Sequence, residues 1–217
     1  TRELGTVGNV GGVGHVVLVA SDEDAVARGH EVLVFSYPTR NDTLDCHAAA
    51  LRAFIQENRR DKPGQRPLHL VGHSMGGMLI LRTLQETGGL PPGRVVLMGS
   101  PVRSSAVARR LCGSAPGRWL LGESAEGGLL EALPDWSYGR EIGVIAGELP
   151  VGFGMLLGGL QGRHDGTVGV DETRIEGATD TLVVRASHTS LVLSRQVAGQ
   201  VCHFLQHGRF SFPSAAS

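Results

Sequence analysis

The sequence predicts an α/β fold, a small, mostly parallel, doubly wound sheet with helices on both faces. Short runs rich in β-branched residues alternate with helical patterns along most of the chain. The 217 residues lie within the range of one compact domain, and no internal repeat or long low-complexity segment interrupts them. We therefore expect one domain over residues 1–217.

Six runs of aliphatic residues predict the strands of this sheet. They cover residues 15–20, 31–37, 66–72, 94–100, 140–148 and 179–187. Helical patterns between and after them cover residues 21–29, 43–59, 75–87 and 189–207. Ser21 or Asp22 is expected to cap the first helix and Thr43 the second, because their side chains accept hydrogen bonds from free helical amides.

Residues 102–140 break the alternation and form a candidate cap or lid insertion. Leucines and both tryptophans of the chain stand there among glycines and serines. Two interpretations remain open: the segment lines an acyl pocket, or it is irregular and buries its apolar residues against the body. Residues 149–160 add further apolar side chains. Together the two segments favour an apolar acyl group over a charged or peptide substrate.

The bulk composition excludes several function classes. The formal net charge of −1 favours neither nucleic acid nor an anionic membrane surface as a partner. The three cysteines are widely spaced and form no disulfide framework or metal-binding pair. No apolar run reaches the ~20 residues of a membrane span, and the first residues lack a signal-peptide pattern. A cytoplasmic location is therefore favoured, while the oligomeric state stays open.

The stretch GHSMGG, residues 72–77, stands between a predicted strand and a predicted helix. A sharp turn there strains Ser74 and presents its hydroxyl at the top of the sheet. Gly72 and Gly76 are needed because a side chain at either position would collide with neighbouring backbone. The alternative is that Ser74 merely caps the helix. In this context we expect a nucleophile, with the Met75 amide donating to an oxyanion.

A serine nucleophile needs a base, and His188 directly follows the last predicted strand. His73 adjoins Ser74, and we expect its side chain to point elsewhere. His203 and His207 lie one helical turn apart, but no glutamate follows His203 and no third ligand is evident. The glycines of GNVGGVG precede a strand rather than follow one, which disfavours a nucleotide loop. We expect no metal and no cofactor.

The imidazole needs a carboxylate to fix its tautomer. Asp165 lies in a glycine-flanked turn between the last two predicted strands, and we assign it this role. Asp171, in the following polar stretch, and Asp180, at the base of the last strand, are rivals. The order serine, aspartate, histidine is the one expected when a nucleophile elbow tops an α/β sheet.

These stretches resemble the lipase and esterase branch of the α/β-hydrolase superfamily, particularly small bacterial hydrolases. The matching stretches are GHSMGG, HDGTVGV followed by TR, and the late SHTSLV. The resemblance covers most of the chain from Val16 onward. It implies the α/β-hydrolase fold and Ser74, Asp165 and His188 as the triad. The elbow motif is shared with thioesterases and acyltransferases, so it indicates the chemistry better than the substrate.

The chain departs from that family after the first predicted strand. The family has a His-Gly loop there, which supplies an oxyanion amide, and then a full helix. Here only residues 21–30 separate two strands, and the His-Gly motif is absent. The second oxyanion donor must therefore come from Ala20, Ser21 or a neighbour, or be missing. Loss of such a donor typically costs about 2.7–4 kcal/mol of transition-state stabilisation.

The predicted function is hydrolysis of a carboxylic ester, including lipid esters, through an acyl-enzyme on Ser74. The shortened region supports an alternative, a hydrolase-fold binding module without useful catalysis. A third reading is acyl transfer by the same triad to an alcohol or amine. The expected partner is a small-molecule or lipid ester.

Overall fold

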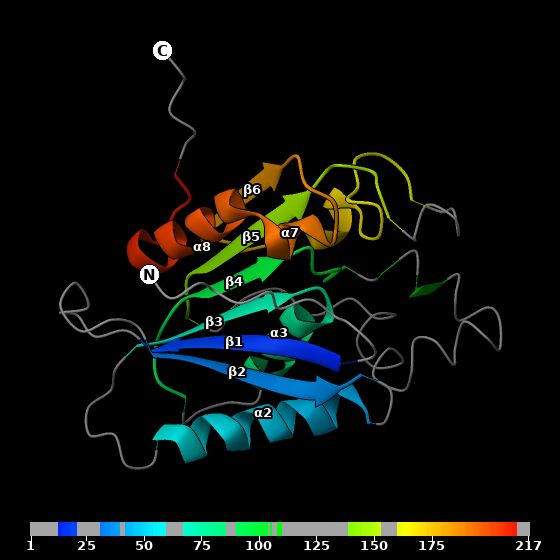
Figure 1. Ribbon diagram of the computed structural model, residues 1–217. Coiled ribbons are helices and arrows are strands. Elements are labelled where there is room, and N and C mark those ends of the chain that lie inside the picture. Colours follow the sequence, from blue (N-terminus) through cyan, green and yellow to red (C-terminus); the bar gives the residue numbers. More distant parts are fainter. Residues whose placement is uncertain are drawn as a thin grey trace.

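The computed structural model describes residues 13–20, 31–39, 42–59, 67–85, 90–103, 105, 108–109, 139–152 and 160–211. Within them lies one six-stranded sheet in the order β2-β1-β3-β4-β5-β6 (Figure 1). The strands are β1 (Val13–Ala20), β2 (Glu31–Pro38), β3 (Leu68–His73), β4 (Val95–Met98), β5 (Ile142–Gly147) and β6 (Asp180–Val184). All six predicted strands are therefore confirmed, with ends shifted by a few residues.

The sheet is mostly parallel, as predicted, but β1 runs against both of its neighbours. β3, β4, β5 and β6 pair in parallel, whereas β1 pairs antiparallel with β2 and with β3. Only residues 21–30 connect β1 to β2. A parallel crossover needs about a dozen residues or more, while antiparallel neighbours need only a short connection. The helix expected over 21–29 lies outside the described residues.

The longer helices begin and end close to the predicted positions. They are α2 (Leu44–Arg59), α3 (Met75–Gln85), α7 (Ser190–Leu193) and α8 (Arg195–His207), and η2 (Val170–Thr173) is a 3-10 turn. Thr43 caps α2 as predicted, because its hydroxyl accepts a 3.3 Å hydrogen bond from the Cys46 amide. The prediction of a single helix over residues 189–207 was wrong, because two helices occupy this range. Ser194 is extended, ends α7 and caps α8 by accepting from the Val197 amide.

Alternate residues of the strands feed two hydrophobic cores, one on each face of the sheet. Val16, Leu70 and Leu97 pack with α2 and α3. Their neighbours Val71 and Val96 pack with α7 and α8 on the opposite face (Figure 1). Period-two burial of this kind is what a doubly covered sheet requires. The two helical layers hold the central strands, whose carboxyl ends carry the site.

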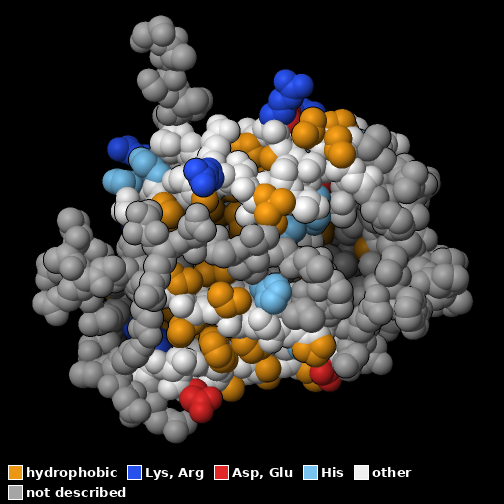
Figure 2. All heavy atoms as spheres, in the orientation of Figure 1, with side chains coloured by type: hydrophobic (Ala, Val, Ile, Leu, Met, Phe, Trp, Pro, Cys, Tyr) orange, Lys and Arg blue, Asp and Glu red, His pale blue; other side chains and the backbone are white. Residues whose placement is uncertain are grey.

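On the face of the sheet that carries α7 and α8, side chains of the edge strand β2 are exposed. Val32 and Val34 are each 45% exposed there, and apolar side chains gather over this part of the sheet in Figure 2. Most of the candidate cap, residues 102–140, lies outside the described residues. In the portion that the structure describes, no helix is both long and apolar enough to cross a membrane.

Candidate active site

Ser74 forms the turn that joins β3 to α3. Its φ of 53° is the one positive φ among the described residues other than glycine. The Ser74 amide donates a 2.9 Å hydrogen bond to the Met98 carbonyl at the end of β4, and the Ser74 carbonyl accepts from the Gly77 amide. A serine held in such a conformation by its surroundings stores backbone strain, a feature concentrated at functional sites. The geometry matches a nucleophile elbow.

The two glycines that flank Ser74 are required by close backbone contacts. A Cβ on Gly72 would lie 2.6 Å from the Gly77 nitrogen, and a Cβ on Gly76 would lie 2.6 Å from the His15 carbonyl oxygen. Real Cβ atoms essentially never approach so closely. Residues without a side chain are therefore required at both positions, as the sequence predicts.

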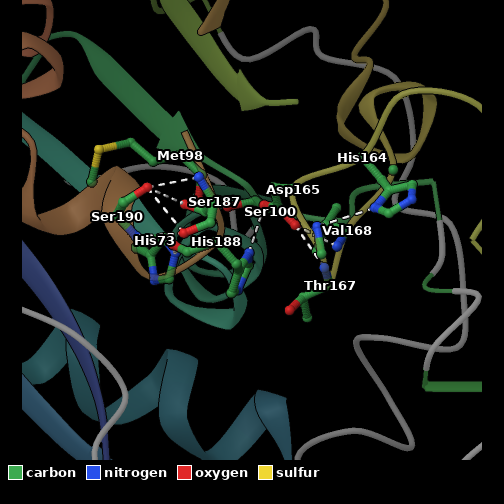
Figure 3. Close-up of polar contacts among 12 residues, drawn as sticks. His73, Met98, Ser100, His164, Asp165, Thr167, Val168, Ser187, His188 and Ser190 are labelled. Carbon is green, nitrogen blue, oxygen red and sulfur yellow. Dashed lines mark hydrogen bonds and ion pairs between the residues drawn. The ribbon is translucent and has the colours of Figure 1, made fainter. Parts of the chain in front are cut away.

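Asp165 is a buried carboxylate in the loop between β5 and β6, with 1% of its surface exposed. One of its oxygens, Oδ1, accepts hydrogen bonds from the amides of Thr167 at 2.9 Å and Val168 at 2.7 Å. The other, Oδ2, lies 2.7 Å from Nδ1 of His188 (Figure 3). Its turn therefore holds the carboxylate in one orientation and directs the second oxygen at the imidazole.

His188 lies in the loop between β6 and α7, and its side chain is 15% exposed. Its backbone amide donates a 2.9 Å hydrogen bond to the Asp165 carbonyl. Because the Asp165 carboxylate can only accept, Nδ1 of His188 carries the proton and Nε2 is left with a lone pair. This is the tautomer of a general base.

The rival carboxylates lie elsewhere. The side chain of Asp171 is 83% exposed and pairs with Arg174. Asp180 begins β6 and accepts from the backbone amides of Thr181 and Phe210. Since β6 runs parallel to β3, its first residue lies at the opposite edge of the sheet from Ser74. Of the three candidates, the structure brings Asp165 to His188.

His73 connects the turn at Ser74 to His188, a contact that the sequence analysis missed. Its side chain was expected to point away from the site, but Nε2 of His73 lies 3.0 Å from the carbonyl oxygen of His188. The two rings are 4.5 Å apart between centroids (Figure 3). Strand periodicity gives the face on which residue 73 lies, but no sequence signal says which loop crosses it.

The hydrogen bonds among the described residues include none between the Ser74 hydroxyl and His188. The two residues are related through His73, which precedes Ser74 in the chain and contacts His188. In free enzymes, catalytic hydrogen bonds are often long and tighten only when substrate binds.

The structure places one of the expected oxyanion donors, Met75, next to Ser74 and another, Ala20, far from it. Met75 is the first residue of α3, so its amide is among those without an acceptor inside the helix. Ala20 pairs with Leu68 at the amino end of β3, roughly 20 Å along the strand from Ser74. The expectation for Ala20 is wrong because β1 runs antiparallel to β3, so that the last residue of β1 lies opposite the first residue of β3. Ser21 lies outside the described residues. It is His15, near the other end of β1, whose backbone contacts the elbow at Gly76.

The remaining histidine pair is on α8. The rings of His203 and His207 stack at 4.2 Å, and their Nδ1 atoms bond the carbonyls of Arg209 and His203. Across the described part of the chain, no group of three or more histidine, cysteine or acidic side chains is placed to hold a metal ion.

This chain is similar to known proteins in sequence and in fold. The family model described as the alpha/beta hydrolase family matches residues 11–198. The chain belongs to the alpha/beta hydrolase family. The resemblance predicted from GHSMGG and the late histidine is thus confirmed. Membership supports hydrolase activity. Comparison with curated proteins gave no match.

Solved structures share this fold. A mature lipase from Bacillus licheniformis superposes with a TM-score of 0.61 at 16% identity, covering 83% of this chain and 79% of that one. A lipase-esterase related protein from Clostridium acetobutylicum gives 0.51 at 16% identity, covering 84% and 86%. Phospholipase PlaB from Legionella pneumophila gives 0.51 at 18% identity, covering 64% of this chain but 36% of the other. At these identities the likeness concerns the fold.

Proposed function

We propose that this alpha/beta hydrolase cleaves carboxylic esters through an acyl-enzyme on Ser74. The observation that carries the proposal is the hydrogen bond between the buried Asp165 carboxylate and the partly exposed His188, which lies beside the strained elbow at Ser74. A carboxylate that fixes the base, and a base next to a serine in a strained turn, are the parts that serine catalysis needs.

In the proposed reaction, Oγ of Ser74 attacks the acyl carbon while Nε2 of His188 takes the hydroxyl proton. Asp165 stabilises the imidazolium that forms. The charged oxygen of the tetrahedral intermediate accepts a hydrogen bond from the Met75 amide at the start of α3. His188 then gives its proton to the leaving alkoxide. Water attacks the acyl-enzyme by the same route, and the carboxylic acid leaves with Ser74 restored.

The site has one assigned oxyanion donor, Met75. Ala20 is too far from Ser74 to be the second, because it lies at the amino end of β3. Ser21, the other expected donor, lies outside the described residues. An oxyanion hole that lacked its second donor would turn over about 10²–10³ times more slowly than a complete one.

The proposed substrate class is supported by two apolar segments of the sequence and by solved structures of similar fold. Leucines and tryptophans of residues 102–140 and the apolar run 149–160 are expected to favour an apolar acyl group. The solved structures of like fold include a lipase and a phospholipase by name, which agrees with that expectation. We propose an acyl chain of medium length.

A second candidate is a hydrolase-fold binding module with little catalysis, which the displaced Ala20 favours. The same residues would serve acyl transfer to an alcohol or amine, which product analysis with competing acceptors distinguishes from hydrolysis. An assay of p-nitrophenyl esters from acetate to medium chains separates enzyme from binding module.

We expect turnover that rises with chain length and that Ser74→Ala abolishes. Ser36→Ala is the matched control, because Ser36 is an exposed serine of β2 whose hydroxyl bonds His15. It should retain full turnover. Ester hydrolysis that survives in Ser74→Ala would refute the nucleophile, and equal rates at every chain length would refute the apolar acyl site.

A further inference from the structure

His73 joins the two halves of the proposed site. It is the last residue of β3, directly before Ser74, and its ring nitrogen Nε2 lies 3.0 Å from the carbonyl oxygen of His188. Asp165 holds the same residue from the other side, with its carbonyl at the His188 amide and its carboxylate at Nδ1. The His188 backbone is therefore fixed at both its N–H and its C=O.

The protonation of His73 follows from its surroundings. Burial first, and then the charge of His188, lower the pKa of His73 to about 3, against weaker raising effects from its hydrogen bond to His188 and from Asp165. The ring is thus neutral at neutral pH. A carbonyl oxygen can only accept, so the proton of neutral His73 must be on Nε2. His73 is a donor to His188 and does not compete with it for the serine proton.

We propose that His73 is a positioning residue that holds the imidazole of His188 at a fixed place relative to Ser74. This inference rests on the proposed function. His73 is bonded covalently to Ser74 and through one hydrogen bond to the backbone of the base, so that any shift of the His188 loop is resisted by the same strand that carries the nucleophile. Misplacement of reacting groups by about 1 Å commonly costs on the order of 100-fold in rate.

A matched pair of amide variants tests this role. In His73→Gln the side-chain nitrogen reaches the place of Nε2, whereas in His73→Asn it falls one methylene short. Both replace the imidazole by the same neutral amide, so loss of the ring affects both alike. With a p-nitrophenyl ester, we expect His73→Gln to keep kcat within about threefold of the parent. We expect His73→Asn to lose about tenfold to hundredfold in kcat with little change in KM.

Amide hydrogen exchange gives a readout that does not depend on catalysis. The His188 amide, bonded to the Asp165 carbonyl, should keep its protection in His73→Gln and exchange at least tenfold faster in His73→Asn. Equal kcat and equal protection in the two variants would overturn the positioning role, as would a loss confined to global stability. If the parent protein has no esterase activity but the exchange difference is seen, the proposed function fails while the anchoring of His188 by His73 stands.

Discussion

The carboxylate of Asp165 performs two tasks with its two oxygens. Oδ1 accepts two backbone amides of its own turn, and Oδ2 accepts from His188. The first set of bonds fixes the carboxylate without using the oxygen that the imidazole needs. A substitution that keeps the first task and reverses the second therefore isolates the role of the acid.

Asp165→Asn is such a substitution. Its Oδ1 can still accept from the amides of Thr167 and Val168, so we expect the fold to remain. Its NH₂ would then face Nδ1 of His188, and two donors cannot bond, so the imidazole would place its proton on Nε2 and lose its function as a base. We expect kcat to fall by about 10⁴, measured by steady-state ester hydrolysis with thermal unfolding as the check on folding.

Asp171→Asn is the control for this change. Asp171 is exposed and pairs only with Arg174 among the ion pairs of the described residues, so we expect kcat within twofold of the parent. The assignment of the acid is wrong if the Asp171 variant is the inactive one and the Asp165 variant keeps its rate.

Strand β1 accounts for most of what the sequence could not predict. Runs of aliphatic and β-branched residues were sufficient to predict each strand that the structure describes, including β2, which is exposed on one face. The direction of β1 relative to β2 depends on the connection formed by residues 21–30. This connection is shorter than a typical parallel crossover, and its length alone would have indicated an antiparallel pair. In the family that the chain resembles, the loop after this strand supplies an oxyanion amide, and the expectation for Ala20 followed from that resemblance.

Candidate site residues could be predicted where the residues that indicate them are contiguous in the sequence. Ser74 follows from a strand, a turn with two small residues and a helix, all contiguous in the chain. His188 was proposed from its place directly after the last predicted strand, and Asp165 from its glycine-flanked turn between the last two predicted strands. His73 was not predictable, because its partner is the His188 backbone, 115 residues later in the chain.

The elbow between β3 and α3 depends on the absence of a side chain at Gly76, which faces the His15 carbonyl of β1. We expect Gly76→Ala to lower the free energy of unfolding by about 1–3 kcal/mol, because strand and helix must separate to admit the methyl group. Gly199→Ala is the matched control within α8, where an added Cβ meets nothing within 4 Å. It should raise stability by about 0.5–1 kcal/mol.

Denaturant unfolding of both glycine variants measures these two changes. A Gly76→Ala protein as stable as the parent would mean that β1 does not pack against the elbow as described.

At the scale of the whole molecule, the order of the strands explains how distant residues meet. Ser74 follows β3, whereas Asp165 and His188 belong to loops at β5 and β6, so β4 stands between them. Gly99 ends β4 in a left-handed conformation, with φ of 54°. A Cβ there would lie 3.1 Å from Oδ2 of Asp165 and 3.2 Å from Nδ1 of His188. Asp165 and His188 thus meet beside a residue without a side chain, directly after the end of β4.

The central claim is that these three loops form one reactive centre at the carboxyl edge of the parallel strands. Labelling with a fluorophosphonate, followed by peptide mass spectrometry, tests it most directly, since the reagent reacts only with an activated serine. We predict a single adduct on the peptide that carries Ser74, and its loss in a folded His188→Ala variant. A folded parent protein with no adduct, or with its adduct on a different serine, would contradict the account.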